Sequence, residues 1–403
     1  MKAPAAAFAL VVVCGVYGFS SQPSGNGVGL RRPISRAELS NVVQKFPQDT
    51  FVAPKGLGGN QHWQTIVGSG ALRKILLGQE LQRGFSVHSV RCFTPDEDEF
   101  EVEFVAGVEG RGFEKEDFLD INSASVSPSR SSDDRPIVVM LHGLEANAKG
   151  NLMTKMCEAF TERGFACVLV SFRGCNGSDN KTVGAYHLGF TQDVDQLTLF
   201  LQKKYPRRRI YLSGFSLGGN VALKFLGELG GKAKDRNILG AVTMSVPYDL
   251  VESGARIDKG INRILYAKNF LSTLKEKAER QHKSFPGVFD IEAIRKCRTM
   301  GEFDNEFIAK IYKFDGKDDY YRQSQAKGWL REIQEPCICI NAVDDPFIEP
   351  ASLPGKEDVH GAPVKLIFHD QGGHCGFVDV KGDDRWIARE LARALAYIHT
   401  STP

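Results

Sequence analysis

The sequence predicts an α/β protein whose mostly parallel central sheet is covered by helices on both faces and carries a helical cap insertion. Two observations support this fold class. Short, continuously apolar runs alternate with segments of helical periodicity, a pattern typical of parallel strands that are buried on both faces. The alternation stops over residues 249–332, which are helical in pattern and rich in Lys, Arg and aromatic residues, and it resumes after them.

The elements of this pattern can be placed along the chain. Phe100, Val102 and Phe104 alternate with Glu101 and Glu103, which predicts a half-exposed strand ahead of the parallel part. Buried parallel strands are expected at Ile137–Leu141, Ala166–Phe172, Ile210–Leu212, Ile238–Val246, Pro336–Asn341 and Val364–Phe368. Helices are expected over residues 150–163, Asp193–Tyr205, Leu217–Leu229 and Asp383–His399.

The domain organisation follows from these elements. Residues 1–37 are interpreted as a targeting or membrane-anchor segment, and residues 38–135 as an N-terminal extension that holds the first strands. Residues 136–248 and 333–403 form the two halves of the α/β core. Residues 249–332 lie between these halves as a helical cap or lid.

Two polar stretches of the N-terminal extension are expected at the surface. Residues 122–135 are Ser-rich and of low complexity, which predicts a disordered surface loop. The acidic run Asp96–Glu99 precedes a strand, and we interpret it as a solvated turn in preference to a calcium site.

The N-terminus carries the pattern of a targeting segment. An apolar run from Ala5 to Phe19 follows Lys2. The stretch after this run contains arginines, and its first acidic residue is Glu38. The run has the length of a signal-peptide core, and acid-poor sequence with Ser and Arg is typical of transit peptides. A cleaved secretory signal, an uncleaved anchor and a plastid presequence all fit, so we expect the secretory pathway, a membrane or a plastid.

Composition limits the partners and cofactors. The formal net charge of +2 over 403 residues gives no reason to expect nucleic acid as a partner. The sequence has no nucleotide-binding G-x-G-x-x-G, no G-x-x-x-x-G-K and no Cys/His cluster with zinc-ligand spacing. We therefore expect no cofactor and no metal.

A candidate nucleophile lies at the centre of Gly214-Phe215-Ser216-Leu217-Gly218, which matches G-x-S-x-G. This pentad also arises by chance in glycine-rich chains, so its context decides its meaning. It follows the strand Ile210–Leu212 and opens the helix from Leu217, which is the setting of the nucleophile elbow of the α/β-hydrolase fold. We therefore predict that Ser216 is the nucleophile.

The base and the acid should follow the nucleophile in the order Ser, Asp or Glu, His. His374 lies between glycines after the last strand, and we predict that it is the base; His369 lacks this setting. The acid comes from Asp344 or Asp345 at the end of an apolar strand. We favour Asp345, because Ile348 supplies the apolar residue three positions later that this motif commonly has, and Asp344 stays the alternative.

Two backbone N–H groups should meet the oxyanion of the tetrahedral intermediate. The first belongs to Leu217, directly after the nucleophile. The second is assigned to Leu144, in the His142-Gly143-Leu144 loop after the strand Ile137–Leu141. His142 is interpreted as structural, because the fold uses this turn to shape the loop.

Several ordered short motifs extend the pattern over residues 56–399. They are Asn60-Gln61-His62-Trp63-Gln64-Thr65, His142-Gly143-Leu144, Phe172-Arg173-Gly174-Cys175, Tyr186-His187, Gly214–Gly219, Asp304 with Phe307, Tyr320-Tyr321-Arg322, Asp344-Asp345-Pro346-Phe347 and Gly372-Gly373-His374. Together they resemble the AB hydrolase 4 family, the YheT-like and plant embryogenesis-associated branch of the α/β-hydrolases.

The resemblance implies carboxylic-ester hydrolysis, since members of this family look like acylglycerol lipases, phospholipases and medium-chain esterases, many with an N-terminal membrane anchor. It also implies that Arg173 and His187 brace loops under the active site. The loop after Leu144 departs from the family, because it begins with Glu145 where small residues are usual.

The cap allows two interpretations. Apolar residues recur at near-helical spacing with basic residues among them, which fits either a helix packed on the core or an interfacial lid that admits lipid. The apolar residues are Ile261, Ile264, Leu265, Leu271 and Leu274, and the basic ones are Lys259, Arg263, Lys268, Lys275 and Lys277.

The favoured function is a serine esterase or lipase that acts on lipid or medium-chain acyl esters through an acyl-enzyme on Ser216. The first alternative is an acyltransferase with the same triad, in which an alcohol replaces water. The second is a catalytically inactive binding protein, which the joint presence of Ser216, Asp345 and His374 disfavours. The expected partner is a small-molecule or lipid ester, with membrane association through the N-terminus.

Overall fold

The structure is a computed structural model, and it describes residues 34–68, 82–106 and 113–402. Most of the predicted targeting segment, residues 1–33, lies outside the described residues. Within the described ranges, no helix combines the length and the apolar character that crossing a bilayer requires.

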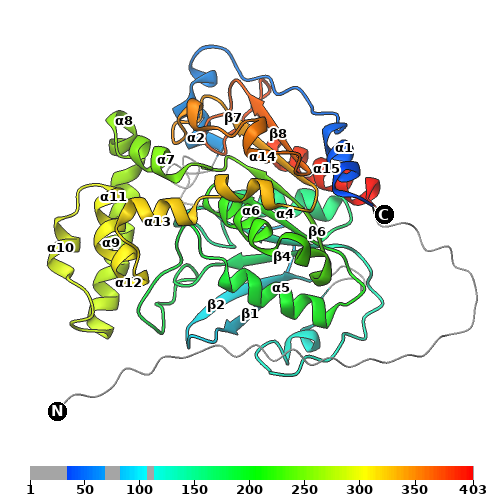
Figure 1. The fold of residues 1–403 in the computed structure, drawn as a ribbon, viewed down its shortest axis with the longest axis horizontal. Helices are drawn as coiled ribbons and strands as arrows, with labels where there is room; N and C mark the ends of the chain where they lie inside the picture. Colours follow the sequence, from blue (N-terminus) through cyan, green and yellow to red (C-terminus); the bar gives the residue numbers. More distant parts are fainter. Residues whose placement is uncertain (1–33, 69–81, 107–112, 403) are drawn as a thin grey trace, which may run out of the picture. The chain divides into compact units, whose positions relative to one another are not determined.

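An eight-stranded sheet forms the centre of the protein (Figure 1). Its spatial order is β1-β2-β4-β3-β5-β6-β7-β8. Strand β2 pairs antiparallel with both β1 and β4, and all pairs from β4 to β8 are parallel. The strands are β1 Val87–Phe93, β2 Glu99–Val105, β3 Ile137–Leu141, β4 Ala166–Ser171, β5 Ile210–Phe215, β6 Ile238–Met244, β7 Cys337–Ala342 and β8 Val364–His369. The predicted mostly parallel α/β sheet is confirmed.

Helices bury both faces of this sheet, which explains why its parallel strands read as continuous apolar runs. In β3, Ile137, Val139 and Leu141 join one buried apolar cluster, whereas Val138 and Met140 join another. The first cluster takes in α5 (Gln192–Lys204) and α6 (Leu217–Leu229). The second takes in α4 (Asn151–Glu162) and α15 (Trp386–Ser401). Shorter helices, α1 (Arg36–Gln44) and α2 (Gln61–Gly68), precede the sheet.

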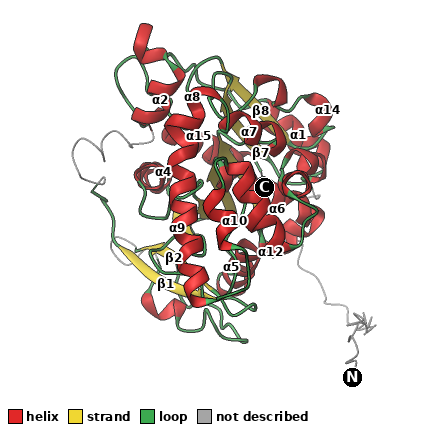
Figure 2. Ribbon diagram, turned by 90° about the vertical axis from the view of Figure 1, so that its left-hand side faces the viewer, coloured by secondary structure: helices red, strands yellow, loops and turns green. Residues whose placement is uncertain are grey.

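A cap of helices lies between β6 and β7 and has an apolar cluster of its own. The cap helices gather on the left of Figure 1 and face the viewer in Figure 2. Two of its turns are π-helical. Such turns often occur at functional positions, and the sequence pattern does not indicate them. The cap elements are α7 Leu250–Ile257, α8 Gly260–Asn262, the π-turn Arg263–Ala267, α9 Lys268–Ser284, α10 Ile291–Lys296, α11 Met300–Phe303, the π-turn Asp304–Ala309, α12 Lys310–Tyr312 and α13 Lys317–Ser324.

Two expectations for the N-terminal extension are wrong. Strand β2 is buried along nearly its whole length, because it lies between β1 and β4 and because Arg83 Nη1 pairs with the fully buried Glu103 at 2.6 Å. The sequence predicts disorder for residues 122–135. In the structure they form an irregular loop that hydrogen bonds hold in position. The Ser127 amide donates to Asp120, and the Ser129 amide donates to the Lys204 carbonyl.

The acidic turn before β2 is also more than a solvated turn, because Asp98 is buried. Its carboxylate accepts hydrogen bonds from the Asn180 side chain and the Lys181 amide, both at 2.8 Å. It also lies 3.6 Å from the Arg173 guanidinium. The turn therefore holds the loop that follows β4.

Arg173 is the centre of a buried ionic group under this loop. Its guanidinium contacts Asp193 and Asp96, each at 2.6 Å, and lies over the Phe190 ring. The Arg173 side chain is only 3% exposed and that of Asp193 only 1%. Loss of this one cation would leave buried carboxylates without a counter-charge.

We therefore expect Arg173→Met to lower the free energy of unfolding by about 3–5 kcal/mol, as removal of one partner of a buried pair does. The matched control is Arg280→Met, which breaks the ion pair with Asp179 that is about half exposed on both sides and should cost at most about 1 kcal/mol. Urea unfolding followed by circular dichroism measures both. Equal small losses in the two variants would contradict a bracing role for Arg173.

Candidate active site

Ser216 lies in a sharp turn between β5 and α6. Its backbone has φ 52° and ψ −125°, a conformation that costs energy for a residue with a side chain. The turn brings Gly214 and Gly218 so close that a Cβ on Gly214 would lie 2.5 Å from the Gly218 carbonyl carbon, and one on Gly218 would overlap the Leu141 carbonyl. The pentad therefore needs glycine at both positions.

The structure brings Ser216, His374 and Asp345 together in one hydrogen-bonded chain. His374 Nε2 lies 2.9 Å from Ser216 Oγ, and His374 Nδ1 lies 2.7 Å from Asp345 Oδ2. Because a carboxylate only accepts, Nδ1 carries the proton and Nε2 is free to accept one from the serine hydroxyl. This is the arrangement in which a histidine can activate a serine.

The two neighbouring aspartates have different partners. Asp345 is fully buried, and its second oxygen accepts from the Phe347 amide at 2.8 Å. Asp344 accepts from the Gly373 amide at 2.9 Å, so it contacts the backbone of the histidine loop and not the imidazole. Burial raises the pKa of Asp344 to about 6, helped by the charge of Asp345.

The charge of Asp345 governs the titration of His374. Burial of the ring lowers the pKa of His374, but the Asp345 carboxylate and its hydrogen bond raise it, and the net shift is upward from 6.5. The Phe347 ring, 4.2 Å from the imidazole, covers part of it. A positive charge on this imidazole would therefore be stabilised.

Residues from two distant segments hold the histidine loop, and sequence reasoning assigns them no role. The His374 amide donates to Thr65 Oγ1 at 2.8 Å, and the Cys375 amide donates to Ser245 Oγ at 2.9 Å. Gln64, fully buried, bonds the Val378 amide and carbonyl. The conspicuous motif that ends in Gln64 and Thr65 is the signal that could have identified the contact.

The loop after β3 presents the predicted oxyanion donor. The Leu144 and Leu217 amides donate to no partner within the described part of the chain, and both residues line the cavity around Ser216. His142 shapes this loop: its Nε2 accepts from the Phe172 amide at 3.1 Å, so its Nδ1 carries the proton and donates to the Gly143 carbonyl. Burial lowers the pKa of His142 to about 4, which keeps the ring neutral.

Glu145, the residue that departs from the family pattern, ties the same loop to its surroundings. It has a left-handed φ of 54°, its amide donates to the Tyr186 hydroxyl, and its carboxylate lies 2.7 Å from Lys277 Nζ in α9. The loop that carries Leu144 is thereby connected to the cap.

A cavity of about 610 Å³ opens above Ser216 and His374. Its walls come from both the core and the cap, and its lining is mostly apolar. The apolar lining includes Leu152, Phe215, Leu250, Leu265, Phe270 and Phe347. The cavity is large enough to bury an acyl chain against Ser216.

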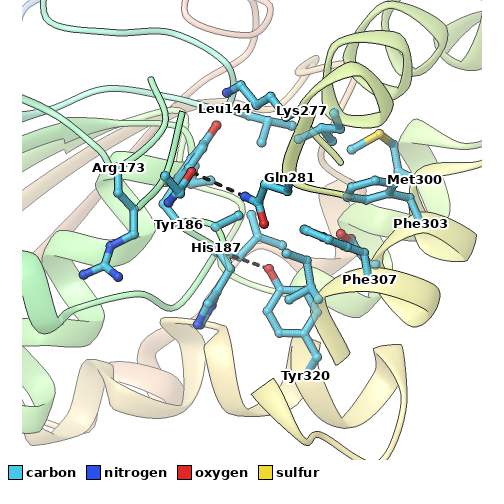
Figure 3. A pocket seen from close by; sticks show the side chains of 17 residues that line it. Leu144, Arg173, Tyr186, His187, Lys277, Gln281, Met300, Phe303, Phe307 and Tyr320 are labelled. Atoms are coloured by element: carbon cyan, nitrogen blue, oxygen red, sulfur yellow. Dashed lines mark hydrogen bonds between the residues drawn. The ribbon is translucent and has the colours of Figure 1, made fainter. Parts of the chain in front are cut away.

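A second, smaller cavity of about 60 Å³ lies beside the first (Figure 3). Figure 3 shows Gln281 near its centre, with Phe303 and Phe307 of the cap on one side and Tyr186 on the other. Five residues line both cavities: Leu144, Leu188, Leu217, Met300 and Asp304.

His187 and Arg173, both with a proposed bracing role, line this smaller cavity and not the larger one. His187 packs against aromatic rings that include Tyr312 and Tyr320. Over the described ranges, no group of three or more His, Cys, Asp or Glu side chains is placed to hold a metal ion.

The chain is similar to known hydrolases. A family profile described as alpha/beta hydrolase fold matches residues 136–379. The candidate esterase YheT of Escherichia coli strain K12 is 30% identical over 298 residues, which cover 73% of this chain and 86% of YheT. A monoacylglycerol lipase of Saccharomyces cerevisiae is 29% identical over 287 residues, covering 68% of this chain and 62% of the lipase.

Solved structures give a more distant likeness. The Pyrococcus furiosus esterase Pf2001 has 18% sequence identity and a TM-score of 0.44, over 77% of this chain and 93% of the esterase. The profile match and the similarity to YheT confirm the resemblance that the motifs carry. The chain therefore belongs to the alpha/beta hydrolase fold family and is an esterase- or lipase-like hydrolase.

Proposed function

We propose that this protein hydrolyses carboxylic esters of lipid or medium-chain acyl groups through an acyl-enzyme on Ser216. The observation that carries the proposal is the hydrogen-bonded chain from Asp345 through His374 to Ser216 at the base of an apolar cavity. Each group has the neighbour that its role needs, and the cavity offers the acyl chain a mostly apolar lining.

The proposed reaction has two steps. Ser216 Oγ attacks the ester carbonyl while His374 Nε2 takes its proton, and the Leu144 and Leu217 amides stabilise the oxyanion. The carbonyl–alkoxy bond then breaks, and His374 gives the proton to the departing alcohol. Water attacks the acyl-enzyme with His374 again as base, which releases the carboxylic acid and restores the Ser216 hydroxyl.

The face of the cap beside the large cavity supports a lipid substrate. Ile261 is 56% and Ile264 is 71% exposed, while the next residues, Leu265 and Tyr266, line the cavity. Lys259, Arg263 and Lys268 are exposed on the same turns. Arg263 donates to the Arg298 carbonyl, and none of the three forms an ion pair with a carboxylate within the described ranges. Apolar side chains between exposed cations suit contact with an anionic lipid surface, to which the Ala5–Phe19 run would add an anchor.

The central prediction concerns the nucleophile. We expect Ser216→Ala to lower the hydrolysis of p-nitrophenyl esters by about a thousandfold or more, because the variant lacks the hydroxyl that would form the acyl-enzyme. Wild-type turnover should peak at one acyl length as esters of increasing length fill the cavity. A folded Ser216→Ala variant that keeps wild-type turnover would overturn the assignment.

A second prediction separates the two aspartates. Asp345→Asn should lower kcat about 10³- to 10⁴-fold, because an amide no longer fixes the tautomer or stabilises the imidazolium. Asp344→Asn, whose amide oxygen can still accept from the Gly373 amide, should keep kcat within about threefold. Steady-state kinetics on one p-nitrophenyl ester measures both variants. The opposite ranking would make Asp344 the acid.

The pH profile gives a third prediction. The neutral form of His374 is the base, so activity should rise as the pH passes through its pKa. Since that pKa is raised, the acid limb of kcat/KM should lie above pH 6.5, the ordinary pKa of a histidine side chain. In Asp345→Asn the limb should move to lower pH, because burial then acts without the carboxylate. An unmoved limb would show that another group titrates.

A fourth prediction concerns the cap face. The double variant Ile261→Ser/Ile264→Ser should reduce hydrolysis of lipid esters in anionic vesicles about fivefold or more, since it removes apolar area from the contact. Hydrolysis of a water-soluble p-nitrophenyl ester should change less than twofold. Val288→Ser, at a cap position that is 57% exposed, is the matched control. Equal losses on both substrates would contradict the interfacial role.

A further inference from the structure

The turn that carries the predicted oxyanion donor holds its third residue in a strained conformation. The Ala146 amide donates to the Gly143 carbonyl at 3.2 Å, so residues 143–146 form a tight turn with Leu144 and Glu145 at its centre. Glu145 has a left-handed φ of 54°. At the third position of a turn such a φ favours glycine or asparagine, because a longer side chain is strained there. Glu145 therefore needs contacts that hold it in this conformation.

One hydroxyl group of the core supplies two of these contacts. The Tyr186 hydroxyl accepts from the Glu145 amide at 2.7 Å and donates to the Glu145 carboxylate at 3.0 Å, which closes a ring around the strained residue. Tyr186 is itself fixed, because it is buried and its ring stacks on Phe172 with the two planes 1° apart. The loop between β4 and α5 thus supports the turn from the side of the core.

A third contact comes from the cap. Lys277 Nζ, on α9, lies 2.7 Å from the same carboxylate oxygen of Glu145 that accepts from Tyr186. The Glu145 side chain is 9% exposed and that of Lys277 24%, so solvent screens this pair only in part. Within the described ranges, Glu145 forms no ion pair with any other cation. The charge that holds Glu145 in its buried position therefore belongs to a different part of the fold from the turn itself.

The same face of α9 attaches the cap to the core. One helical turn beyond Lys277, the Gln281 side chain accepts from the Gly184 amide and donates to the Gly184 carbonyl, in the loop between β4 and α5. Figure 3 shows Tyr186, Lys277 and Gln281 around the small cavity that they line. A displacement of α9 from this loop would therefore also separate Lys277 from Glu145.

We propose that Lys277 is a positioning residue for ester hydrolysis. Through Glu145 it fixes the turn that presents the Leu144 amide to the oxyanion, so the oxyanion site is complete only while α9 is seated on the core. This inference rests on the proposed hydrolysis at Ser216 and concerns the regulation of that site. Lys277 contacts no reacting atom in this account. Its contribution arises in the transition state, where the oxyanion forms, and not in the binding of the ester.

The test measures kcat and KM of the full chain on a medium-chain p-nitrophenyl ester. Lys277→Met keeps the length of the side chain and removes its charge. We expect kcat to fall about tenfold or more while KM changes less than about threefold, since a displaced donor loses part of the about 10²- to 10³-fold that one oxyanion donor contributes. Lys277→Arg, which restores the cation, should recover kcat to within about threefold of wild type.

Two further variants separate the link from the packing of the cap. Lys275→Met is the matched control, because Lys275 lies on the same helix and donates to the Arg295 and Cys297 carbonyls, which belong to the cap itself. It should leave kcat within about twofold of wild type. Glu145→Gly breaks the link from the other side, because glycine tolerates the left-handed φ but does not tie the turn to the cap. Its kcat should again fall about tenfold, and adding Lys277→Met should lower it less than about twofold further.

A transition-state analogue gives a readout that cap packing alone would not move. An alkyl trifluoromethyl ketone adds to Ser216 and forms an oxyanion, whereas the methyl ketone of the same chain length is far less electrophilic and fills the cavity without one. Lys277→Met should weaken inhibition by the trifluoromethyl ketone in parallel with kcat/KM. Inhibition by the methyl ketone should stay within about twofold of wild type.

Three results would overturn the assignment to Lys277: a kcat that stays at the wild-type value, a loss that Lys275→Met reproduces, or an equal loss in the wild-type and Glu145→Gly backgrounds. A rise in KM with kcat unchanged would likewise make Lys277 a packing residue of the cap. A wild type that hydrolyses no ester would instead overturn the proposed function itself. The two kinds of failure are therefore distinguishable in one set of measurements.

Discussion

The strained turn at Ser216 is the constraint on which the site depends. A left-handed φ on a residue with a side chain is tolerated only where its surroundings fix it, and here β5, α6 and the close approach of Gly214 and Gly218 do so. The turn lifts Oγ out of the sheet toward His374 and leaves the first amides of α6 free. The turn is anchored at the middle of the buried parallel sheet, because β5 pairs with β3 and β6 on its two sides.

The remaining groups reach Ser216 on loops, so their positions depend on contacts between distant parts of the chain. The His374 loop is held by α2 through Gln64 and Thr65 and by Ser245 after β6. The Leu144 loop is held by His142 from within and by Lys277 of the cap from outside. Because Lys277 pairs with Glu145, the residue next to Leu144, the cap both lines the cavity and contacts the loop of the predicted oxyanion donor.

Most of the sheet and the positions of Ser216 and His374 could be predicted from sequence, because parallel strands and the elbow leave local signatures. As the partner of His374 the sequence favours Asp345 over its neighbour Asp344, and the structure places Asp345 against the ring. A local sequence pattern does not indicate which residue, far away in the chain, will contact a given side chain or amide. Thr65 bonds the His374 amide from 309 positions away, and the alternation in β2 gave no sign that Arg83 would neutralise Glu103. The burial of Asp98 and Asp304 likewise follows from tertiary packing.

The most direct test of the account is to find where a serine-reactive probe attaches. The native protein is treated with a fluorophosphonate, digested, and its peptides are analysed by mass spectrometry. The account predicts a single phosphonylated site at Ser216, with labelling greatly slowed in His374→Ala because the base is gone. Attachment at another residue, or no labelling of folded and active protein, would contradict it.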